Sequence, residues 1–349
     1  MKRILMIGQF SGPPTGEKTI NIETRDILLN FGYVVKVLDS CLISTVVKVG
    51  GFSFYKLFMA IKTFMHASFF LTKIDILYAT PGQSIFGILR FIPIIFFYIL
   101  FKKRIYLHWH GYGVYNLVSN SRFLKWFLLG PNINHIYLTK DLHSKMLNLG
   151  GISSISYVLN NFNHLGGDKK NFKLNKKKLN VLYMGSLIRS KGINQFISAS
   201  KICDANFNFH VCGEGDSICL KTVLDAQRQG FLIYHGVVTG EDKLILFQDA
   251  DIFVLQTSYK IEGVPLALLE AMGAGCAVVT TSHNGIPETV EDSGVYLKNL
   301  SDLALVEKLF FLEKDRETLN KYQHKAYQRS KKFQRYRYEK TLMKIIESI

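Results

Sequence analysis

The sequence contains few cysteines, few prolines and few acidic residues. Its five cysteines are scattered and none forms a C-x-x-C pair, which excludes a disulfide framework and a structural zinc site and favours a reducing compartment. Seven prolines exclude a collagen-like chain and a proline-rich linker. Only 27 aspartates and glutamates oppose 43 lysines and arginines, so the formal net charge is +16. Such an excess indicates an anionic partner, which could be nucleic acid, an anionic membrane surface or a phosphorylated ligand.

Long hydrophobic runs are also lacking. The most apolar stretch, Phe91–Phe101, is bounded by Arg90 and by Lys102–Arg104, whereas a transmembrane helix needs about 20 apolar residues. The stretch already contains Pro93, and extending it back to Ile85 adds Gly87 and Arg90. We therefore expect a helix that covers a sheet, with one face available to lipid. The amino-terminal run Arg3–Ile7 is too short for the core of a signal peptide and predicts a buried strand.

Short hydrophobic runs, by contrast, recur along the whole chain. A hydrophobic content of 48% in 349 residues excludes a disordered chain and favours two domains. In the first half, a helical pattern over residues 20–30 stands among short apolar runs. These runs predict strands at 3–7, 33–38, 74–79, 105–108 and 136–138. Near-continuous apolar strands separated by helices indicate a parallel sheet covered on both faces, which is the doubly wound α/β arrangement.

The same pattern restarts after a polar, lysine-rich stretch, Asn160–Asn180, whose composition is typical of a surface linker. Strands are expected at 181–184, 207–212, 231–235, 252–256 and 277–280, with helices at 194–201, 218–229, 241–248 and 265–272. Residues 303–349 are expected to be helical throughout. We therefore divide the chain into a first domain (1–165), a second domain (166–325) and a C-terminal helical segment (326–349). Two doubly wound domains facing each other across a cleft suit a reaction with two substrates, because ligands bind beyond the carboxyl ends of parallel strands.

The segment most specific for a function is Glu262–Pro287, which follows the predicted strand 252–256. Its start predicts a strand-to-helix turn, with Pro265 in the first helical turn. The free amides and the positive end of such a helix favour an anion such as a diphosphate. Glu270 lies about two helical turns beyond Glu262. One carboxylate could accept sugar hydroxyls and the other ribose hydroxyls, although two glutamates at this spacing also occur on ordinary amphipathic helices.

This E-x7-E pair, with AMGAGCAVVTT and NGIPE after it, resembles the donor-binding signature of glycosyltransferase family 4. Val181–Gly192 (VLYMGSLIRSKG) resembles the family's element of a strand, Gly-Arg-Leu, a loop and Lys-Gly, and His210–Asp216 (HVCGEGD) resembles its Gly-x-Gly turn. The resemblance covers nearly the whole second domain and, more faintly, the first. It implies the GT-B fold, with two Rossmann-like domains and C-terminal helices packing back toward the first domain. It also implies a retaining, metal-independent transfer of a hexose from a nucleotide sugar.

The resemblance further implies a role for each residue that matches the motifs. Glu270 would bind the nucleotide ribose, Glu262 would meet the donor sugar or the positive charge developing at its anomeric carbon, and Lys191 would neutralise the departing diphosphate. The other implied donor-binding residues are Gly16, Gly185, Arg189, Gly213, Gly263, Val264, Pro265 and Leu266. The arginine that the family usually has at the start of the loop is Ser186 here, which makes Arg189 the nearest substitute.

Two segments of the first domain contain candidate ligand-binding residues. Gln9–Glu17 follows the first strand, and its glycines allow close approach to a ligand. It is not a P-loop, because Glu17 stands where that motif requires lysine. In Tyr106–Gly111, strand alternation places His108 and His110 on the same side of the chain. No third ligand stands at a recognisable spacing, so no metal site is predicted. The resemblance implies that His110 acts at the active site and leaves His108 a packing role.

We therefore expect a retaining glycosyltransferase that uses a UDP-linked donor and requires no cofactor. Its acceptor is expected to be a saccharide or a polyprenyl-linked saccharide of a bacterial surface polysaccharide pathway. The charge of +16, the run Phe91–Phe101 and the aromatic, basic segment Phe52–Phe70 favour a cytoplasmic enzyme attached to the anionic inner face of the cell membrane. Two alternatives remain. They are a sugar-nucleotide 2-epimerase of the same fold and a basic nucleic-acid-binding protein, for which the sequence shows no recognition motif.

Overall fold

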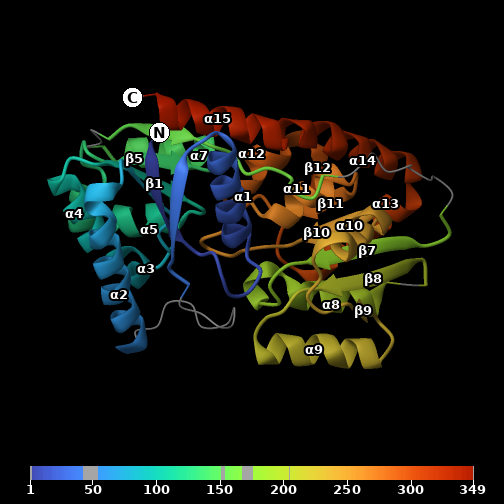
Figure 1. Cartoon of the computed structure of the whole chain (residues 1–349). Helices are drawn as coiled ribbons and strands as arrows, with labels where there is room; N and C mark the ends of the chain where they lie inside the picture. Colours follow the sequence, from blue (N-terminus) through green and yellow to red (C-terminus); the bar gives the residue numbers. More distant parts are fainter. Residues whose placement is uncertain (1, 42–53, 151–153, 167–175, 204, 349) are drawn as a thin grey trace. The chain divides into compact units, whose positions relative to one another are not determined.

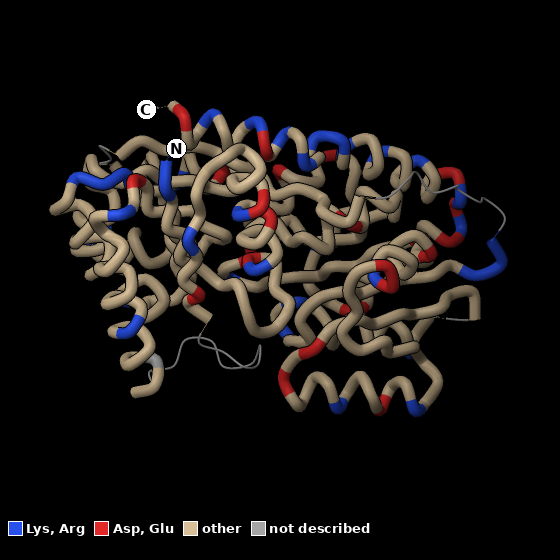
Figure 2. The backbone as a smooth tube through the Cα atoms, viewed as in Figure 1, with Lys and Arg blue, Asp and Glu red and all other residues tan. Residues whose placement is uncertain are grey.

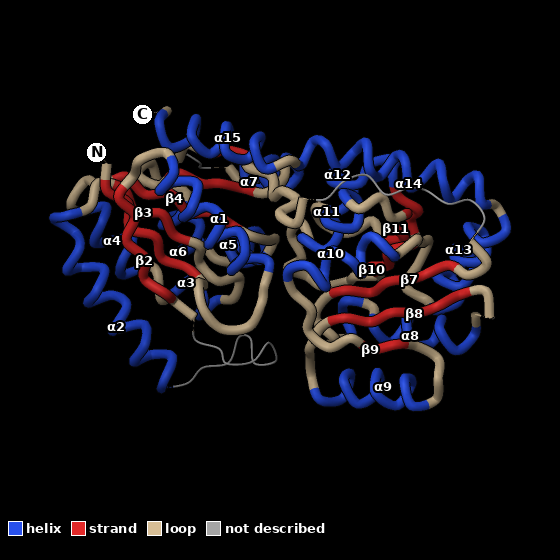
Figure 3. Tube along the Cα trace, turned by 45° about the vertical axis from the view of Figure 1, so that its right-hand side comes forward, coloured by secondary structure: helices blue, strands red, loops and turns tan. Residues whose placement is uncertain are grey.

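The computed structural model describes residues 2–41, 54–150, 154–166, 176–203 and 205–348 (Figure 1). The chain divides into two compact units. Unit 1 comprises Met1–Asn160 and Glu339–Ile349, and unit 2 comprises Asn161–Tyr338. Within the described residues of each unit, six strands form one parallel sheet with helices on its faces (Figure 3).

The sheet of unit 1 has the strand order β2-β1-β3-β4-β5-β6. Its strands are β1 (Arg3–Gly8), β2 (Val34–Asp39), β3 (Ile76–Ala79), β4 (Arg104–Trp109), β5 (Asn134–Tyr137) and β6 (Ser156–Val158). Its helices are α1 (Gly16–Asn30), α2 (Phe54–Phe70), α3 (Ile85–Leu89), α4 (Ile92–Leu100), α5 (Gly113–Ser119), α6 (Arg122–Leu128) and α7 (Lys140–Asn148), joined by most of α15 (Arg335–Glu347). The central strands are buried almost throughout, as expected of parallel strands covered on both faces.

Alternate side chains of these strands pack against helices on opposite faces of the sheet. On one face, Leu5, Leu77 and Leu107 form a buried cluster with residues of α2, α4, α6 and α7. On the other face, the hydroxyl of Tyr106 donates a hydrogen bond to the carbonyl oxygen of Ile345 in α15 (3.0 Å). This packing explains why the last residues of the chain belong to unit 1.

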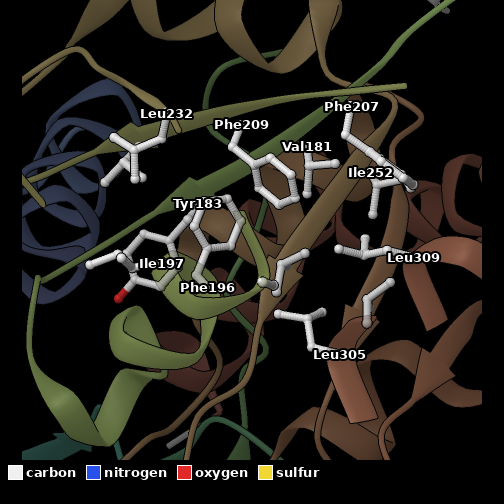
Figure 4. Packing of buried hydrophobic residues seen from close by; sticks show 14 of the residues in the cluster. Val181, Tyr183, Phe196, Ile197, Phe207, Phe209, Leu232, Ile252, Leu305 and Leu309 are labelled. Atoms are coloured by element: carbon white, nitrogen blue, oxygen red, sulfur yellow. The ribbon is translucent and has the colours of Figure 1, made fainter. Parts of the chain in front are cut away.

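The sheet of unit 2 has the strand order β12-β11-β10-β7-β8-β9. Its strands are β7 (Leu179–Met184), β8 (Phe207–Cys212), β9 (Ile233–Tyr234), β10 (Ile252–Leu255), β11 (Ala277–Thr280) and β12 (Gly294–Tyr296). Its helices are α8 (Ile193–Ile202), α9 (Ser217–Arg228), α10 (Gly240–Asp249), α11 (Leu266–Gly273), α12 (Ile286–Val290), α13 (Asp302–Lys314) and α14 (Arg316–Ser330). Figure 4 shows the core between the sheet and α8, where the ring of Phe196 packs against Tyr183 and Phe209 with centroids 5.6 and 5.4 Å apart.

Ten of the strands lie where the apolar runs predict them, and the predicted doubly wound α/β class is confirmed. The strands β6 and β12, of three residues each, were not predicted. The expectation that residues 303–349 are helical is confirmed for the described residues, apart from two short breaks between helices. Asp315 ends α13 and caps α14 through a hydrogen bond from the Thr318 amide (2.9 Å), and Gln334 adopts an extended conformation before α15.

The units divide after Asn160 and after Tyr338, whereas the sequence analysis divided the chain after residues 165 and 325. Of the predicted linker, residues 167–175 lie outside the described residues, and β7 begins at Leu179. The apolar run that required a membrane check forms α4, which buries Ile94, Ile95 and Tyr98 against the sheet as expected. Within the described ranges, no helix is both long and apolar enough to cross a membrane.

Candidate functional site

Two glycine turns meet where β7 and β8 end. The backbone of Gly213 has φ +131°, and a Cβ atom there would collide with the carbonyl oxygen of Gly185. The amide of Gly185 donates to the carbonyl oxygen of Cys212 (3.1 Å), and the amide of Gly213 donates to that of Gly236 (2.7 Å). A Cβ atom at Gly185 would meet nothing within 4 Å. The turn therefore leaves open space beside a backbone that a ligand can approach closely.

Lys191 and Glu262 form an ion pair in unit 2. Lys191 ends the short helical turn Arg189–Lys191, after which Gly192 turns the chain with φ +84°. The Nζ atom of Lys191 lies 3.4 Å from Oε1 and 3.3 Å from Oε2 of Glu262. The hydroxyl of Thr257 donates to the same Oε2 (3.3 Å). Both charged side chains are largely buried, and their pairing avoids the cost of isolated buried charges.

The turn that presents Glu262 is held by side chains from the segment after β11. Asn284, with φ +47°, donates from Nδ2 to the carbonyl oxygens of Lys260 (3.2 Å) and Glu262 (3.1 Å). The Nε2 atom of His283 lies 2.9 Å from the carbonyl oxygen of Tyr259. These contacts join the segment after β11 to the turn that presents Glu262.

The residues between the two glutamates lead directly into α11. Pro265 (φ −61°) immediately precedes the first helical residue, Leu266, so the predicted start of this helix is correct to within one residue. The side-chain amide of Asn161 donates to the carbonyl oxygen of Val264 (3.2 Å) and fixes the turn from outside. Because the first amides of a helix lack partners within the helix, this end of α11 is suited to an anion.

Glu270 lies on α11 and is completely buried. Its Oε1 atom accepts a hydrogen bond from Nζ of Lys243 on α10 (2.7 Å). Nδ1 of His164 lies 3.1 Å from the same oxygen. Burial lowers the pKa of His164, and Lys243 lowers it further, whereas Glu270 opposes the shift. The other carboxylate oxygen of Glu270, Oε2, is buried and has no hydrogen-bond partner among the described residues.

In unit 1, Gly16 is the first residue of α1, which Thr15 caps by accepting a hydrogen bond from the amide of Lys18 (3.2 Å). Glu17 follows in the first helical turn, near Arg90 and the hydroxyl of Thr80. Burial raises the pKa of Glu17 to about 7, although the charge of Arg90 and the hydrogen bond with Thr80 both act to lower it.

The two histidines at the end of β4 lie on the same side of the chain, as predicted, with ring centroids 4.2 Å apart. His108 is fully buried, and its Nδ1 lies 2.7 Å from the hydroxyl of Tyr78, which fits the expected packing role. The Nε2 atom of His110 is buried and has no hydrogen-bond partner among the described residues. Burial lowers the pKa of His110 to about 3, so its imidazole is neutral near pH 7.

The structure therefore groups some of the predicted residues and separates others. In unit 2, Lys191 lies beside Glu262, whereas Glu270 pairs with Lys243 and His164, which the sequence analysis did not single out. Arg189 is exposed, and its side chain forms no hydrogen bond or ion pair with other described residues. In the described part of the chain, no three His, Cys, Asp or Glu side chains are placed to hold a metal ion.

Comparison with solved structures defines the class of fold. Over 100% of both chains, the structure is similar to that of Anabaena Alr3699/HepE in complex with UDP and glucose, with a TM-score of 0.72 at 16% identity. WaaG, a glycosyltransferase involved in lipopolysaccharide biosynthesis, gives a TM-score of 0.71 at 14% identity, over 99% of this chain and 100% of WaaG. Together with the two parallel-sheet units, these similarities show the GT-B fold that the sequence predicts.

Comparison with families and curated proteins concerns mainly unit 2. The family model "Glycosyl transferases group 1" matches residues 167–329. AmsK of Erwinia amylovora, an amylovoran biosynthesis glycosyltransferase, is 32% identical over 136 residues, which cover 36% of this chain and 33% of AmsK. N,N'-diacetylbacillosaminyl-diphospho-undecaprenol alpha-1,3-N-acetylgalactosaminyltransferase of Campylobacter jejuni is 31% identical over 148 residues, which cover 42% of this chain and 38% of that enzyme. The matched region thus spans well under half of either relative.

Proposed function

We propose that this chain is a retaining glycosyltransferase of family 4 that transfers a hexose from a UDP-linked donor. The acceptor is a saccharide or a polyprenyl-linked saccharide in the synthesis of a bacterial surface polysaccharide. The observation that carries the proposal is the buried, unpartnered Oε2 of Glu270, on the same helix whose first turn is suited to a diphosphate. The names of the two curated relatives, one of which acts on an undecaprenol-linked substrate, support the choice of acceptor.

In the proposed reaction, the bond between the anomeric carbon and the diphosphate oxygen breaks, and its electron pair goes to that oxygen. The acceptor hydroxyl oxygen forms the new bond to the anomeric carbon on the face that the diphosphate leaves, and the hydroxyl proton goes to the departing diphosphate oxygen. Lys191 neutralises the negative charge that develops there, aided by the amino-terminal end of α11. Glu262 faces the positive charge that develops on the sugar ring. Gly185, Gly213 and the turn Gly263–Leu266 allow the backbone to approach the donor closely. No metal ion is required in this scheme, and none of the relatives named above is an epimerase.

The donor assignment predicts a specific effect of Glu270. UDP at about 100 times its dissociation constant should stabilise the wild-type chain by about 2.7 kcal/mol in thermal unfolding. Glu270→Ala should bind UDP about tenfold or more weakly in isothermal titration calorimetry, because it loses a hydrogen bond to a charged acceptor. Glu241→Ala, an exposed acid at the start of α10, serves as the matched control. Equal UDP affinity in Glu270→Ala and in wild type would contradict the assignment.

We also propose that unit 1 attaches to the anionic inner face of the cell membrane. Three helices that cover one face of its sheet expose large apolar side chains, which we call the apolar helix surface. These side chains are Phe54, Leu57, Phe58, Ile61, Met65 and Phe69 of α2, Phe96 and Leu100 of α4, and Phe123 and Trp126 of α6. Trp126 is 75% exposed. An exposed apolar area of this kind marks an interaction site, and aromatic side chains are typical of the membrane interface.

The charge around the apolar helix surface favours an anionic lipid surface as its partner. Residues 54–128 contain nine lysines and arginines and a single acidic residue, Asp75. In Figure 2, α2 accordingly carries no acidic position. Exposed cations beside the surface include Lys62, Lys73 and Lys102. Each basic residue near an anionic leaflet contributes about 1 kcal/mol, so a few suffice for reversible attachment.

Flotation with liposomes tests this attachment. The chain should float with vesicles of phosphatidylglycerol and phosphatidylethanolamine at low salt and should be released by high salt. The double variant Phe58→Ser/Met65→Ser should remain at the bottom, whereas Ile218→Ser/Leu303→Ser, at two equally exposed positions of unit 2, should float like wild type. Flotation that is unaffected by the α2 variant, or equal with neutral lipid at high salt, would refute the proposed surface.

A further inference from the structure

The carboxylate of Glu270 is held asymmetrically. Its Oε1 accepts from Nζ of Lys243 at 2.7 Å and lies 3.1 Å from Nδ1 of His164, while Oε2 has no partner among the described residues. The three side chains come from different parts of unit 2, since Glu270 lies on α11, Lys243 on α10 and His164 in the segment that begins the unit. The contacts therefore orient the carboxylate and leave one oxygen for another donor.

The carboxylate of Glu270 is completely buried beside the ammonium group of Lys243. An isolated buried carboxylate is costly, and pairing with a cation offsets much of this cost. His164 contributes less charge, because burial lowers its pKa. An ionised carboxylate is an acceptor only. Its free Oε2 can thus accept a hydrogen bond from a hydroxyl group, and a charged acceptor makes this bond stronger than a neutral one.

We propose that Lys243 is a positioning residue for the nucleotide ribose, acting through Glu270. It holds Oε1, and this contact presents Oε2 to a ribose hydroxyl and makes the site prefer ribonucleotides to nucleotides that lack the 2′- and 3′-hydroxyls. The inference rests on the proposed function, because it takes the ligand of Glu270 to be a nucleoside diphosphate. It goes beyond that function by assigning the selectivity for ribose to a residue that does not touch the ligand.

A merely structural role would have a different signature. Lys243 also lies over the ring of Phe247, with Nζ 6.0 Å from the centroid, so its removal could loosen α10. Loosening of α10 would weaken the binding of every nucleotide to the same extent. Loss of the proposed contact would weaken only nucleotides that carry the ribose hydroxyls. The comparison of two ligands therefore separates the two roles.

The test is isothermal titration calorimetry of the full chain with UDP and with 2′,3′-dideoxy-UDP, using wild type, Lys243→Met, Lys243→Arg and Glu270→Gln. Wild type should prefer UDP by about tenfold or more. Lys243→Met should reduce this preference to about twofold or less while its affinity for the dideoxy compound stays within about twofold of wild type, and Glu270→Gln should behave in the same way. Lys243→Arg should recover part of the preference. Lys221→Met, at an exposed position of α9, is the control and should match wild type.

Three outcomes would overturn the proposal. Equal losses for UDP and the dideoxy compound in both Lys243 variants would show a structural role. A ribose preference that is lost in Glu270→Gln but retained in Lys243→Met would leave the proposed function intact and refute the role of Lys243. If the wild-type chain bound none of UDP, GDP, ADP and TDP, both the proposed function and this inference would fall together. Thermal unfolding of each variant establishes that it is folded, and Lys243→Arg provides the test if Lys243→Met is not.

Discussion

Replacing Lys191 by alanine is expected to lower kcat for sugar transfer by about 10²–10³-fold. The ammonium group lies beside Glu262 at the carboxyl end of the sheet of unit 2, where the proposed diphosphate departs. Removing one preorganised donor to a developing negative charge typically costs a factor of this size. UDP affinity should change less than turnover, because the charge on the leaving oxygen develops fully only in the transition state. Initial rates and UDP titrations on the same preparation measure both quantities.

Loss of Lys191 also leaves the carboxylate of Glu262 without its cation, so stability has to be separated from catalysis. Although Thr257 still donates to Oε2 in the variant, a largely buried carboxylate without its cation is costly, and we expect a clear fall in Tm. Lys191→Arg keeps the charge and should recover part of kcat. Lys221→Ala, at an exposed position on α9, should leave both Tm and kcat unchanged. Wild-type turnover in Lys191→Ala would remove Lys191 from the proposed mechanism.

Much of the fold could be predicted because its signals are local. Buried parallel strands are short apolar runs, and runs such as Ile252–Leu255 are buried at every position. The turn before α11 was predictable for the same reason, because Pro265 and the glutamates around it are close in sequence. Local signals also have limits. Asp315 separates α13 from α14 by capping α14, but in the sequence it cannot be told from an ordinary surface acid within a helical pattern.

The parts of the site that sequence could not reveal are contacts between distant segments. Lys243 is one of 43 lysines and arginines and stands in no motif, yet it reaches Glu270 because α10 leads into β10 and α11 follows the same strand. His164 belongs to the segment that begins unit 2 and meets the same carboxylate. Thr257, which donates to Glu262, could have been suspected from its place just after β10. A polar residue at the carboxyl end of a parallel strand is often turned toward a ligand.

The replacement of the family's arginine by Ser186 remains a specific question for this chain. The exposed side chain of Arg189 forms no contact with other described residues that would fix it near the ion pair of Lys191 and Glu262. In the structure, therefore, Lys191 is the cation beside Glu262, and it is the cation whose replacement tests the mechanism.

Replacing His110 by alanine is expected to lower kcat/KM by about tenfold or more with little change in Tm. We propose that His110 forms a hydrogen bond to the substrate through Nε2, which is buried and unpartnered at the end of β4. A lost hydrogen bond of about 1.4 kcal/mol corresponds to a factor of ten. His110→Gln keeps a side-chain amide that can serve as a donor or an acceptor and should recover part of the rate. His108→Ala should instead lower Tm, because it empties a buried position and removes a hydrogen bond with the Tyr78 hydroxyl.

The pH dependence distinguishes this role of His110 from that of a cation. Since burial lowers its pKa to about 3, the imidazole stays neutral at every pH above about 4, and the contribution of His110 to kcat/KM should be constant between pH 5 and about 8. The free energy of unfolding should also depend on pH, and it should fall at low pH, whereas a histidine that is stabilised in its protonated form would raise it there. The unfolded chain takes up this proton as the pH falls through the ordinary value of 6.5, while the folded chain does not, so protein stability should decline below that pH. A rate contribution of His110 that titrates with a midpoint near 6.5 would show that the imidazole acts as a charged acid, and it would replace the hydrogen-bonding role with proton transfer.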